Sequence, residues 1–222
     1  VDVEWLEGSD PTRGVAAIRR AKGGPARLDP GWLPAPGELG AAVAGCHLLA
    51  ASGAAHGGWG EREVRFDLPT PLQVPIGAFF QGNRHLLRAL FDRVAELAGA
   101  NGEPVFDLHA GVGFLAAAVR SRGARSMDLI EPQLEAARAA ARNLPEARVA
   151  IGVTAEQFAE RQPVGPPEAL VITDPPRSGM TPPLRRALAR WRPRRVLMLG
   201  CDPATWARDA AFLCDHGFRI AA

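Results

Sequence analysis

The sequence predicts an α/β protein with a doubly wound parallel sheet in residues 79–222 and a small β-rich subdomain in residues 1–78. Three observations lead to this prediction. From Asn83 onward, short apolar runs alternate with stretches of helical periodicity, as in parallel sheets covered by helices on both faces. A turn with two glycines follows the first of these runs. Before residue 79, alternating stretches stand among Gly and Pro clusters, which is typical of strands and turns.

Composition narrows the class of protein. The 222 residues are 47% hydrophobic and 23% charged, which are ordinary globular values. No apolar run approaches the length of a membrane helix, and no signal-peptide pattern opens the sequence. The three cysteines are odd in number and widely spaced, and no histidine pairs with them at ligand spacing. We therefore expect a cytoplasmic protein with free thiols, no metal site and no membrane span.

Basic residues are almost all arginine. Lys22 is the only lysine among 26 basic residues, and the formal net charge is only +2. One group of arginines could follow an RNA backbone, or could equally be the solvated face of a helix and its exit loop. The group consists of Arg185, Arg186, Arg190, Arg192, Arg194 and Arg195.

The elements follow in order along the chain. In the small subdomain we expect strands at Val1–Leu6 and Val64–Leu68 and a helix at Glu38–Ala51. Asn83 is then expected to cap a helix that runs to about Ala98. Six apolar runs predict strands at Pro104–Leu108, Ser126–Ile130, Arg148–Ile151, Ala169–Thr173, Arg195–Leu199 and Phe218–Ala221. The stretches between them predict helices at 112–122, 132–143, 154–162, 181–191 and 203–216.

The first strand of the larger domain leads into a turn suited to a cofactor. Gly111 and Gly113 allow a tight turn whose backbone amides can approach a ligand at the start of a helix. The next strand ends in Glu131, whose carboxylate could accept hydrogen bonds from both hydroxyls of a ribose. Together these features indicate a cofactor that contains adenosine.

The charge at this turn separates two cofactor classes. A dinucleotide would place its pyrophosphate on the helix end, and Ala116 is compatible with that motif. However, Asp107 closes the strand, and a carboxylate there repels a pyrophosphate and favours a cation. S-adenosylmethionine carries an ammonium and a sulfonium, so the charges favour it. The remaining alternative is a plain turn with an acid that caps the helix.

Two later strand ends carry groups suited to chemistry. Asp174 is followed by two prolines, which make a stiff extended turn at the edge where ligands bind. Cys201 lies one residue before Asp202, a good N-cap, and Pro203 fits the first helical position. The helix dipole there favours a thiolate, although the Asp202 carboxylate partly opposes it. We expect Cys46 and Cys214 to be ordinary small hydrophobic residues.

A cysteine facing a methyl donor has a clear use. Carbon 5 of a pyrimidine is too weak a nucleophile to take a methyl group by itself. Addition of a thiolate to carbon 6 converts the ring to an enolate, which can attack the methyl group. A base then removes the proton from carbon 5, and the thiol leaves.

Four segments resemble the ordered motifs of the RNA (uracil-5-)-methyltransferases, and the resemblance covers about Pro75 to Ala222. The segments are Phe79–Asn83, Asp107–Gly113, Asp174–Gly179 and Gly200–Asp209. The resemblance implies a Rossmann-like class I methyltransferase domain that uses S-adenosylmethionine to methylate tRNA or rRNA. It implies that Cys201 is the nucleophile and that Phe79, Pro175 and Arg177 lie near the target uridine. It further implies a cofactor site lined by Gln81, Asp107, His109, Gly111, Gly113, Glu131 and Asp174. The target uridine must be flipped out or single-stranded to be reached.

The sequence departs from the family at several positions. The family usually has Tyr or Phe at His109, Cys at Ala110, Ser at Gly200 and Asn at Asp202. An acid that usually contacts the adenine is not evident at Val153 and Thr154. The family's base is a glutamate in a segment with Phe-Pro and His-x-Glu patterns, which has no counterpart before Ala222. We therefore expect that a further C-terminal segment is missing from this sequence.

Two other functions stay open. An amino-group methyltransferase also uses an Asp-Pro-Pro turn, but it usually has an aromatic residue where Arg177 stands and needs no cysteine. A non-catalytic module that binds RNA or the cofactor would explain the missing glutamate. Residues 1–78 carry no motif from which a function can be read, and RNA contact is one role that they could have.

Overall fold

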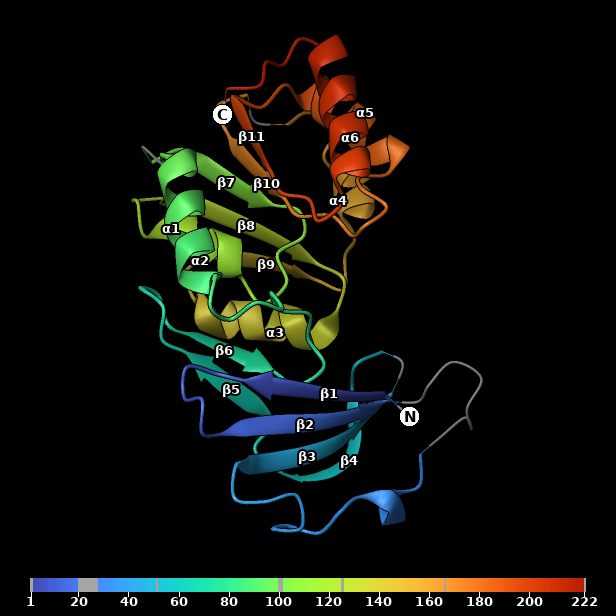
Figure 1. Ribbon diagram of the computed structural model, residues 1–222. Coiled ribbons are helices and arrows are strands. Elements are labelled where there is room, and N and C mark those ends of the chain that lie inside the picture. The colour runs from blue at the N-terminus through green and yellow to red at the C-terminus, as the bar shows by residue number, and fades with distance from the viewer. Residues whose placement is uncertain are drawn as a thin grey trace. The chain divides into compact units, whose positions relative to one another are not determined.

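The computed structural model describes residues 2–19, 28–50, 52–99, 102–124, 126–165 and 167–221. These residues form two compact units, Val1–Leu87 and Arg88–Ala222 (Figure 1).

The N-terminal unit contains two small sheets. A four-stranded sheet has the order β1-β2-β3-β4, in which only the β2/β3 pair is parallel. The second sheet is the antiparallel pair of β5 and β6. The elements are β1 (Asp2–Glu7), β2 (Gly14–Arg19), a short 3-10 helix (Pro30–Trp32), β3 (Val43–Leu49), β4 (Ala55–Gly60), β5 (Glu63–Phe66) and β6 (Leu72–Pro75). Strands β1 and β5 confirm the two strands predicted here, with shifts of one or two residues, although Val1 lies outside the described residues.

The helix predicted at Glu38–Ala51 is wrong. Val43–Leu49 is the strand β3, and it pairs with β2 on one side and β4 on the other. Cys46 and Leu48 are fully buried in this strand. Periodicity alone does not separate a short buried strand from a buried helix, and pairing on both sides decides it here. The close packing of this strand also needs glycine at position 45, because a Cβ there would lie 2.1 Å from the backbone oxygen of Glu61.

The C-terminal unit is a five-stranded, fully parallel sheet with the order β11-β10-β7-β8-β9. Its strands are β7 (Pro104–Asp107), β8 (Ser126–Glu131), β9 (Arg148–Ile151), β10 (Leu170–Thr173) and β11 (Arg195–Met198). Its helices are α1 (Leu87–Ala98), α2 (Phe114–Arg120), α3 (Leu134–Asn143), α4 (Ala155–Arg161), α5 (Pro182–Trp191) and α6 (Pro203–Asp215). The doubly wound α/β prediction is confirmed.

Two predicted elements near the ends of this domain need correction. The helix expected to begin at Asn83 begins at Leu87, because Asn83 Oδ1 accepts a hydrogen bond from the His85 amide in a preceding turn at 3.1 Å. Phe218–Ala221 is not a strand. A strand needs a hydrogen-bonded neighbour, and the Phe218 amide instead donates to the Leu213 carbonyl at the end of α6.

Helices cover both faces of the sheet. Figure 1 shows α1, α2 and α3 along one face and α4, α5 and α6 along the other. The second face is packed with large side chains, including Phe106, Leu184 and Trp191. On the first face the buried side chains of α2 and α3 are mostly alanine, which lets these helices approach the strands closely. Successive residues of one strand point to opposite faces of the sheet, so Phe106 packs in the core of the second face and Val105 is buried on the first.

Local sequence also sets where α4 begins. Thr154 Oγ1 accepts a hydrogen bond from the Gln157 amide at 3.2 Å, and Gln157 Oε1 accepts one from the Thr154 amide at 3.0 Å. This reciprocal pair satisfies amides that a helix start leaves free. Across the described ranges, no helix is both long enough and apolar enough to cross a bilayer. Those ranges also contain no group of three His, Cys, Asp or Glu side chains arranged to hold a metal.

Candidate functional site

The order of the parallel strands predicts where a ligand binds. Along the chain the sheet grows from β7 to β8 and β9 in one direction and from β7 to β10 and β11 in the other. Ligands of such sheets bind at the carboxyl ends of the strands, at the point where the order reverses. Asp107 ends β7, and Asp174 follows the end of β10 directly, so the two acids flank this reversal point. Glu131 ends β8 on the other side of β7.

The turn after β7 depends on its two glycines. Gly111 and Gly113 have φ values of 54° and 90°, a left-handed conformation that glycine adopts without strain. Gly113 is the N-cap of α2, and its amide donates to the Ala110 carbonyl at 2.8 Å. Asn143 Nδ2 donates to the Val112 carbonyl at 2.9 Å and so ties the turn to the end of α3.

Glu131 is connected directly to this turn. Its Oε2 accepts a hydrogen bond from the Gly111 amide at 2.8 Å, and its Oε1 accepts one from the Gln133 amide at 2.7 Å. Burial raises the pKa of Glu131, and these two hydrogen bonds act in the opposite direction. Each carboxylate oxygen has a second lone pair, so a ligand hydroxyl could still donate to it.

Asp107 is the most unusual acid of the site. Its side chain is fully buried, and Oδ1 accepts a long hydrogen bond, 3.4 Å, from the His109 amide. No described residue hydrogen-bonds to Oδ2. Burial raises the pKa of Asp107 to about 7, and the negative charges of Asp174 and Glu131 contribute to the rise. Backbone hydrogen bonds from His109 and Ala116 act to lower the pKa of Asp107. A buried carboxyl oxygen without a hydrogen-bond partner is costly, and a cationic ligand would satisfy it.

His109 links the two strands of the reversal point. Its Nδ1 lies 3.1 Å from Oγ1 of Thr173, the fully buried last residue of β10. Burial lowers the pKa of His109 to about 4, against the attraction of the Glu156 carboxylate, so the imidazole is neutral at pH 7. Thr173 is not among the site residues expected from the sequence, although its position at a strand end, directly before Asp174, was a signal that could have found it.

Cys201 lies on the turn between β11 and α6 and is exposed. Cys46 is buried as expected, but the expectation that Cys214 is a small buried hydrophobic residue is wrong, because its position on α6 is exposed. Asp202 caps α6, accepting a hydrogen bond from the Thr205 amide at 2.9 Å, and Pro203 opens the helix. That hydrogen bond holds the pKa of Asp202 below its usual value. The predicted cap is therefore confirmed, and the thiol immediately precedes it.

The thiol turn and the proline turn meet. Cys201, Pro175 and Gly179 line one cavity of about 10 Å³, which has room for about one water molecule. Thr205 Oγ1, on the first turn of α6, donates to the Arg177 carbonyl at 3.0 Å. Because the cavity is this small, a pyrimidine would have to contact Cys201 from its exposed side.

Half of the arginine group is held by bonds within the protein. Arg185 pairs with the buried Asp209 at 3.0 Å, Arg190 donates to the Pro163 carbonyl at 3.1 Å, and Arg195 pairs with Glu103. These three side chains stabilise the packing of α5 and β11, so they are not available to follow an RNA backbone. The interpretation of a solvated helix face is also too simple, because the Arg185 side chain is only 14% exposed.

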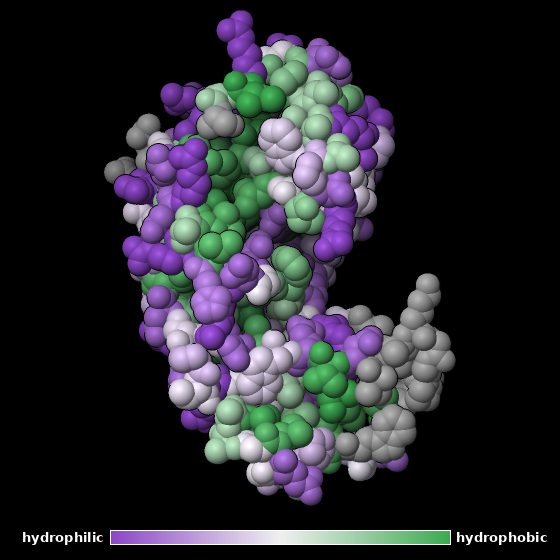
Figure 2. All heavy atoms as spheres, in the orientation of Figure 1, coloured by the Kyte–Doolittle hydropathy of each residue, from purple (hydrophilic) through white to green (hydrophobic). Residues whose placement is uncertain are grey.

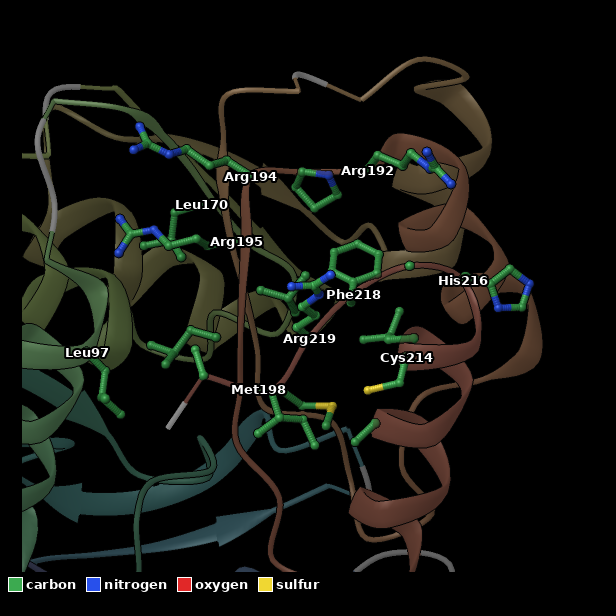
Figure 3. A pocket seen from close by; sticks show the side chains of 18 of the residues that line it. Leu97, Leu170, Arg192, Arg194, Arg195, Met198, Cys214, His216, Phe218 and Arg219 are labelled. Carbon is green, nitrogen blue, oxygen red and sulfur yellow. The ribbon is translucent and has the colours of Figure 1, made fainter.

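A larger cavity lies beside the edge strand β11 and contains none of the residues predicted to bind cofactor or uridine. It measures about 560 Å³, and its walls come from β11, α6 and the C-terminal segment, with Met198, Phe218 and Arg219 among the residues drawn in Figure 3. Figure 2 shows apolar residues gathered in this hollow. The hollow exists because β11 is an edge strand whose residues are only half-buried.

The structure thus brings most of the predicted cofactor residues together in one unit. Asp107, His109 and Glu131 are connected to the glycine turn, and Asp174 lies across the reversal point from Asp107. Phe79 and Gln81 belong to the N-terminal unit, where the Phe79 side chain is 72% exposed.

Solved structures share this fold. A crystal structure of Pyrococcus abyssi tRNA (uracil-54, C5)-methyltransferase, in complex with S-adenosyl-L-homocysteine, matches with a TM-score of 0.70 and 24% identity. The match covers 94% of this chain and 52% of that one. Trm5b from Pyrococcus abyssi matches with a TM-score of 0.54 and 15% identity, over 91% of this chain and 63% of that one. The chain has the Rossmann-like methyltransferase fold.

Sequence comparison finds relatives named as uncharacterized RNA methyltransferases. One from Caldanaerobacter subterraneus is 29% identical over 163 residues, which are 71% of this chain and 35% of that protein. One from Thermotoga maritima is 30% identical over 151 residues, which are 67% of this chain and 34% of that protein. The chain therefore spans about a third of the length of these relatives. No protein-family model matches the sequence.

Proposed function

We propose that the chain is part of an S-adenosylmethionine-dependent RNA methyltransferase that methylates carbon 5 of a uridine in tRNA or rRNA. The observation that carries the proposal is the exposed Cys201 thiol, which shares a cavity with Pro175 at the edge of the sheet where the acids of the reversal point also lie. A thiol and a cation site at one edge are two of the groups that carbon 5 methylation uses, beside the base that removes the proton.

The residues of the site fit S-adenosylmethionine. Asp107 presents a buried carboxyl whose Oδ2 accepts no hydrogen bond from the described residues, which suits the ammonium or sulfonium charge of this cofactor. Glu131 has lone pairs for ribose hydroxyls, and the Gly111–Gly113 turn allows close backbone approach. When bound, the cofactor supplies a methyl group on a positively charged sulfur. His109 and Asp174 complete the wall of this proposed site.

RNA as the substrate is supported by the names of the relatives and by the similarity of the fold to the Pyrococcus abyssi tRNA (uracil-54, C5)-methyltransferase. The acceptor atom in the name of that enzyme supports carbon 5 of uracil here. In the N-terminal unit, Trp5 and Phe79 are 43% and 72% exposed, and exposed aromatic rings are suited to stacking on bases. We propose that residues 1–78 contact the RNA, and that the reaction takes place in the cytoplasm, where the thiol stays reduced.

The proposed reaction starts at Cys201. Its thiolate forms a bond to carbon 6 of the uracil, and the electron pair of the 5,6 double bond moves into the enolate of carbon 4. Carbon 5 would then take the methyl group that a bound cofactor supplies, with the bonding pair left on the cofactor. A base removes the proton from carbon 5, and the electrons of that bond re-form the double bond and expel the thiolate. Pro175 and Arg177 would orient the uracil beside the thiol.

Trapping with 5-fluorouridine tests this reaction. Fluorine at carbon 5 cannot leave as a proton does, so the methylated adduct keeps its bond to Cys201 and resists denaturation. We expect wild-type protein, incubated with S-adenosylmethionine and 5-fluorouridine tRNA and rRNA, to form an adduct on a denaturing gel. Cys201→Ala should form none, and Cys214→Ala, which removes another exposed thiol, should form as much as wild type.

Other outcomes of the trapping experiment would favour a different nucleophile or a different function. An adduct that persists in Cys201→Ala would refute the assigned nucleophile. Methyl transfer to RNA without any adduct would favour an amino-group methyltransferase, for which the Asp174-Pro175 turn is the supporting feature. Cofactor binding without adduct or methyl transfer would favour a non-catalytic binding module.

A further inference from the structure

Three side chains on one face of α6 hold the backbone of the loop that follows β10. Thr205, Arg208 and Asp209 are spaced three and four residues apart, so they lie on the same side of the helix. The loop contains Pro175 and Arg177, which the proposed function assigns to uridine binding. The turn that carries Cys201 leads directly into α6, the helix whose polar side chains bind this loop.

Asp209 is the buried centre of this contact. Its side chain is 1% exposed, and Oδ2 accepts a hydrogen bond from the Met180 amide at 2.6 Å. Its Oδ1 accepts from Arg185 at 3.0 Å and from Arg208 at 2.7 Å. A carboxylate with these charge-assisted bonds is a rigid anchor for the end of the loop.

Arg208 and Thr205 hold the carbonyls of the same loop. Arg208 Nη2 donates to the Ser178 carbonyl at 2.9 Å, and Thr205 Oγ1 donates to the Arg177 carbonyl at 3.0 Å. Gly179, with φ 74°, makes room for this contact, because a Cβ there would lie 2.5 Å from Arg208 Nη2 and from Asp209 Oδ2. The loop backbone therefore lies directly against the helix.

The same helix also fixes the thiol turn. Asp202 caps its first turn, and Trp206 Nε1 donates to the Met198 carbonyl at the end of β11 at 3.2 Å. One helix is thus hydrogen-bonded to the strand before Cys201 and to the loop that contains Pro175 and Arg177. A shift of either turn would break bonds to α6.

We propose that the Arg208–Asp209 pair, with Thr205, is a positioning device that sets the proline loop relative to Cys201 for attack on carbon 6 of the uridine. This inference rests on the proposed function. The residues do not touch the reacting atoms. They act through the backbone of Arg177–Met180, and their contribution appears when the C–S bond forms and the electron pair of the double bond moves into the enolate.

Arg208→Lys tests the device. Lysine keeps the charge, but its single ammonium cannot replace both Nε, which donates to Asp209 Oδ1 at 2.9 Å, and Nη2, which donates to Asp209 Oδ1 and to the Ser178 carbonyl. We expect the rate constant of 5-fluorouridine adduct formation, at saturating RNA and S-adenosylmethionine, to fall by about tenfold to a hundredfold. The dissociation constant of S-adenosylmethionine should stay within about twofold, because the pair does not contact the acids at the reversal point.

Two further variants keep the test decisive. Arg93→Lys, on α1, changes an exposed arginine that pairs only with Glu96 nearby, and it should react at the wild-type rate. Thr205→Val removes the hydroxyl bonds to the Arg177 and Asp202 carbonyls and leaves the Thr205 amide on the Asp202 side chain. It should slow adduct formation by a smaller factor, even if Arg208→Lys folds poorly.

The rate constant and the final amount of adduct together distinguish a positioning role from a role in stability alone. A purely structural role would lower the final amount of adduct and leave the rate constant of the folded fraction unchanged. Unchanged rate constants in both Arg208→Lys and Thr205→Val would overturn the inference while the proposed function stands. If wild-type protein forms no adduct, the proposed function itself fails, and the inference about positioning fails with it.

Discussion

Asp107→Asn tests the charge of the site through the stability of the free protein. The pKa of Asp107 rises from 3.8 to about 7 because the carboxyl is buried beside two other acids. The folded protein therefore holds a proton that the unfolded chain releases, and the free energy of unfolding falls as the pH rises from about 4 to about 7. A difference of roughly three pKa units corresponds to about 4 kcal/mol at most.

Asparagine has nearly the same shape and no charge. We expect Asp107→Asn to match or slightly lower the stability of wild type at pH 5, and to be the more stable protein at pH 8. The stability of the variant relative to wild type should shift by about 2–3 kcal/mol between the two pH values, since about two of the three pKa units lie above pH 5 and each is worth about 1.4 kcal/mol. Urea unfolding from pH 5 to pH 8 measures it. Asp92→Asn, which removes an exposed carboxylate of α1, is the matched control and should show no such trend.

The same variant tests the ligand. Loss of the carboxylate should weaken S-adenosylmethionine binding at pH 8 by at least about tenfold, or 1.4 kcal/mol, in isothermal titration calorimetry. A parallel pH dependence of stability in variant and wild type would show that Asp107 is not the buried titrating group. Unchanged affinity for S-adenosylmethionine, with the predicted gain in stability, would refute the role of Asp107 in binding a cation.

The remaining predictions concern other contacts. Gly113→Ala should destabilise the protein by about 1–2 kcal/mol in urea, because its φ of 90° strains alanine and the new Cβ would lie 3.1 Å from Leu144. Thr173→Val should lower the free energy of unfolding by about 1 kcal/mol in the same measurement and weaken S-adenosylmethionine binding, because His109 loses its hydrogen-bond partner. An unchanged affinity for S-adenosylmethionine would show that His109 is not part of the cofactor site. Gly45→Ala should lower the melting temperature of the N-terminal unit, because its Cβ would collide with the Glu61 carbonyl, and retention of protease resistance in residues 1–87 would contradict this.

Most elements of the larger domain were predictable because their signals are local. Strands β7 to β11 are short apolar runs, and the helices between them have regular periodicity and clear caps, as at Thr154 and Asp202. The cofactor turn is also local, since two glycines and a strand-end acid lie within a few residues. The sequence does not predict the strand order, which the pairing of β7 with β8 on one side and β10 on the other decides.

The failures have one cause. Val43–Leu49 has no local feature that excludes a helix, and only pairing with β2 and β4 makes it a strand. Phe218–Ala221 has the composition of a strand but no hydrogen-bonded neighbour. Arg185 has the appearance of a surface charge, but Asp209 binds it from another helix.

The sequence alone therefore determined the parallel α/β domain, the glycine turn, the acids at the strand ends and the place of Cys201 before a capped helix. Periodicity, turn chemistry and caps depend on residues that are near one another in the chain. Only the tertiary structure decided that Asp107 is buried without a second partner, that His109 bonds to Thr173, and that Asp209 anchors the proline loop to α6. Burial and these contacts join residues far apart in the sequence, and neither can be read from a local pattern.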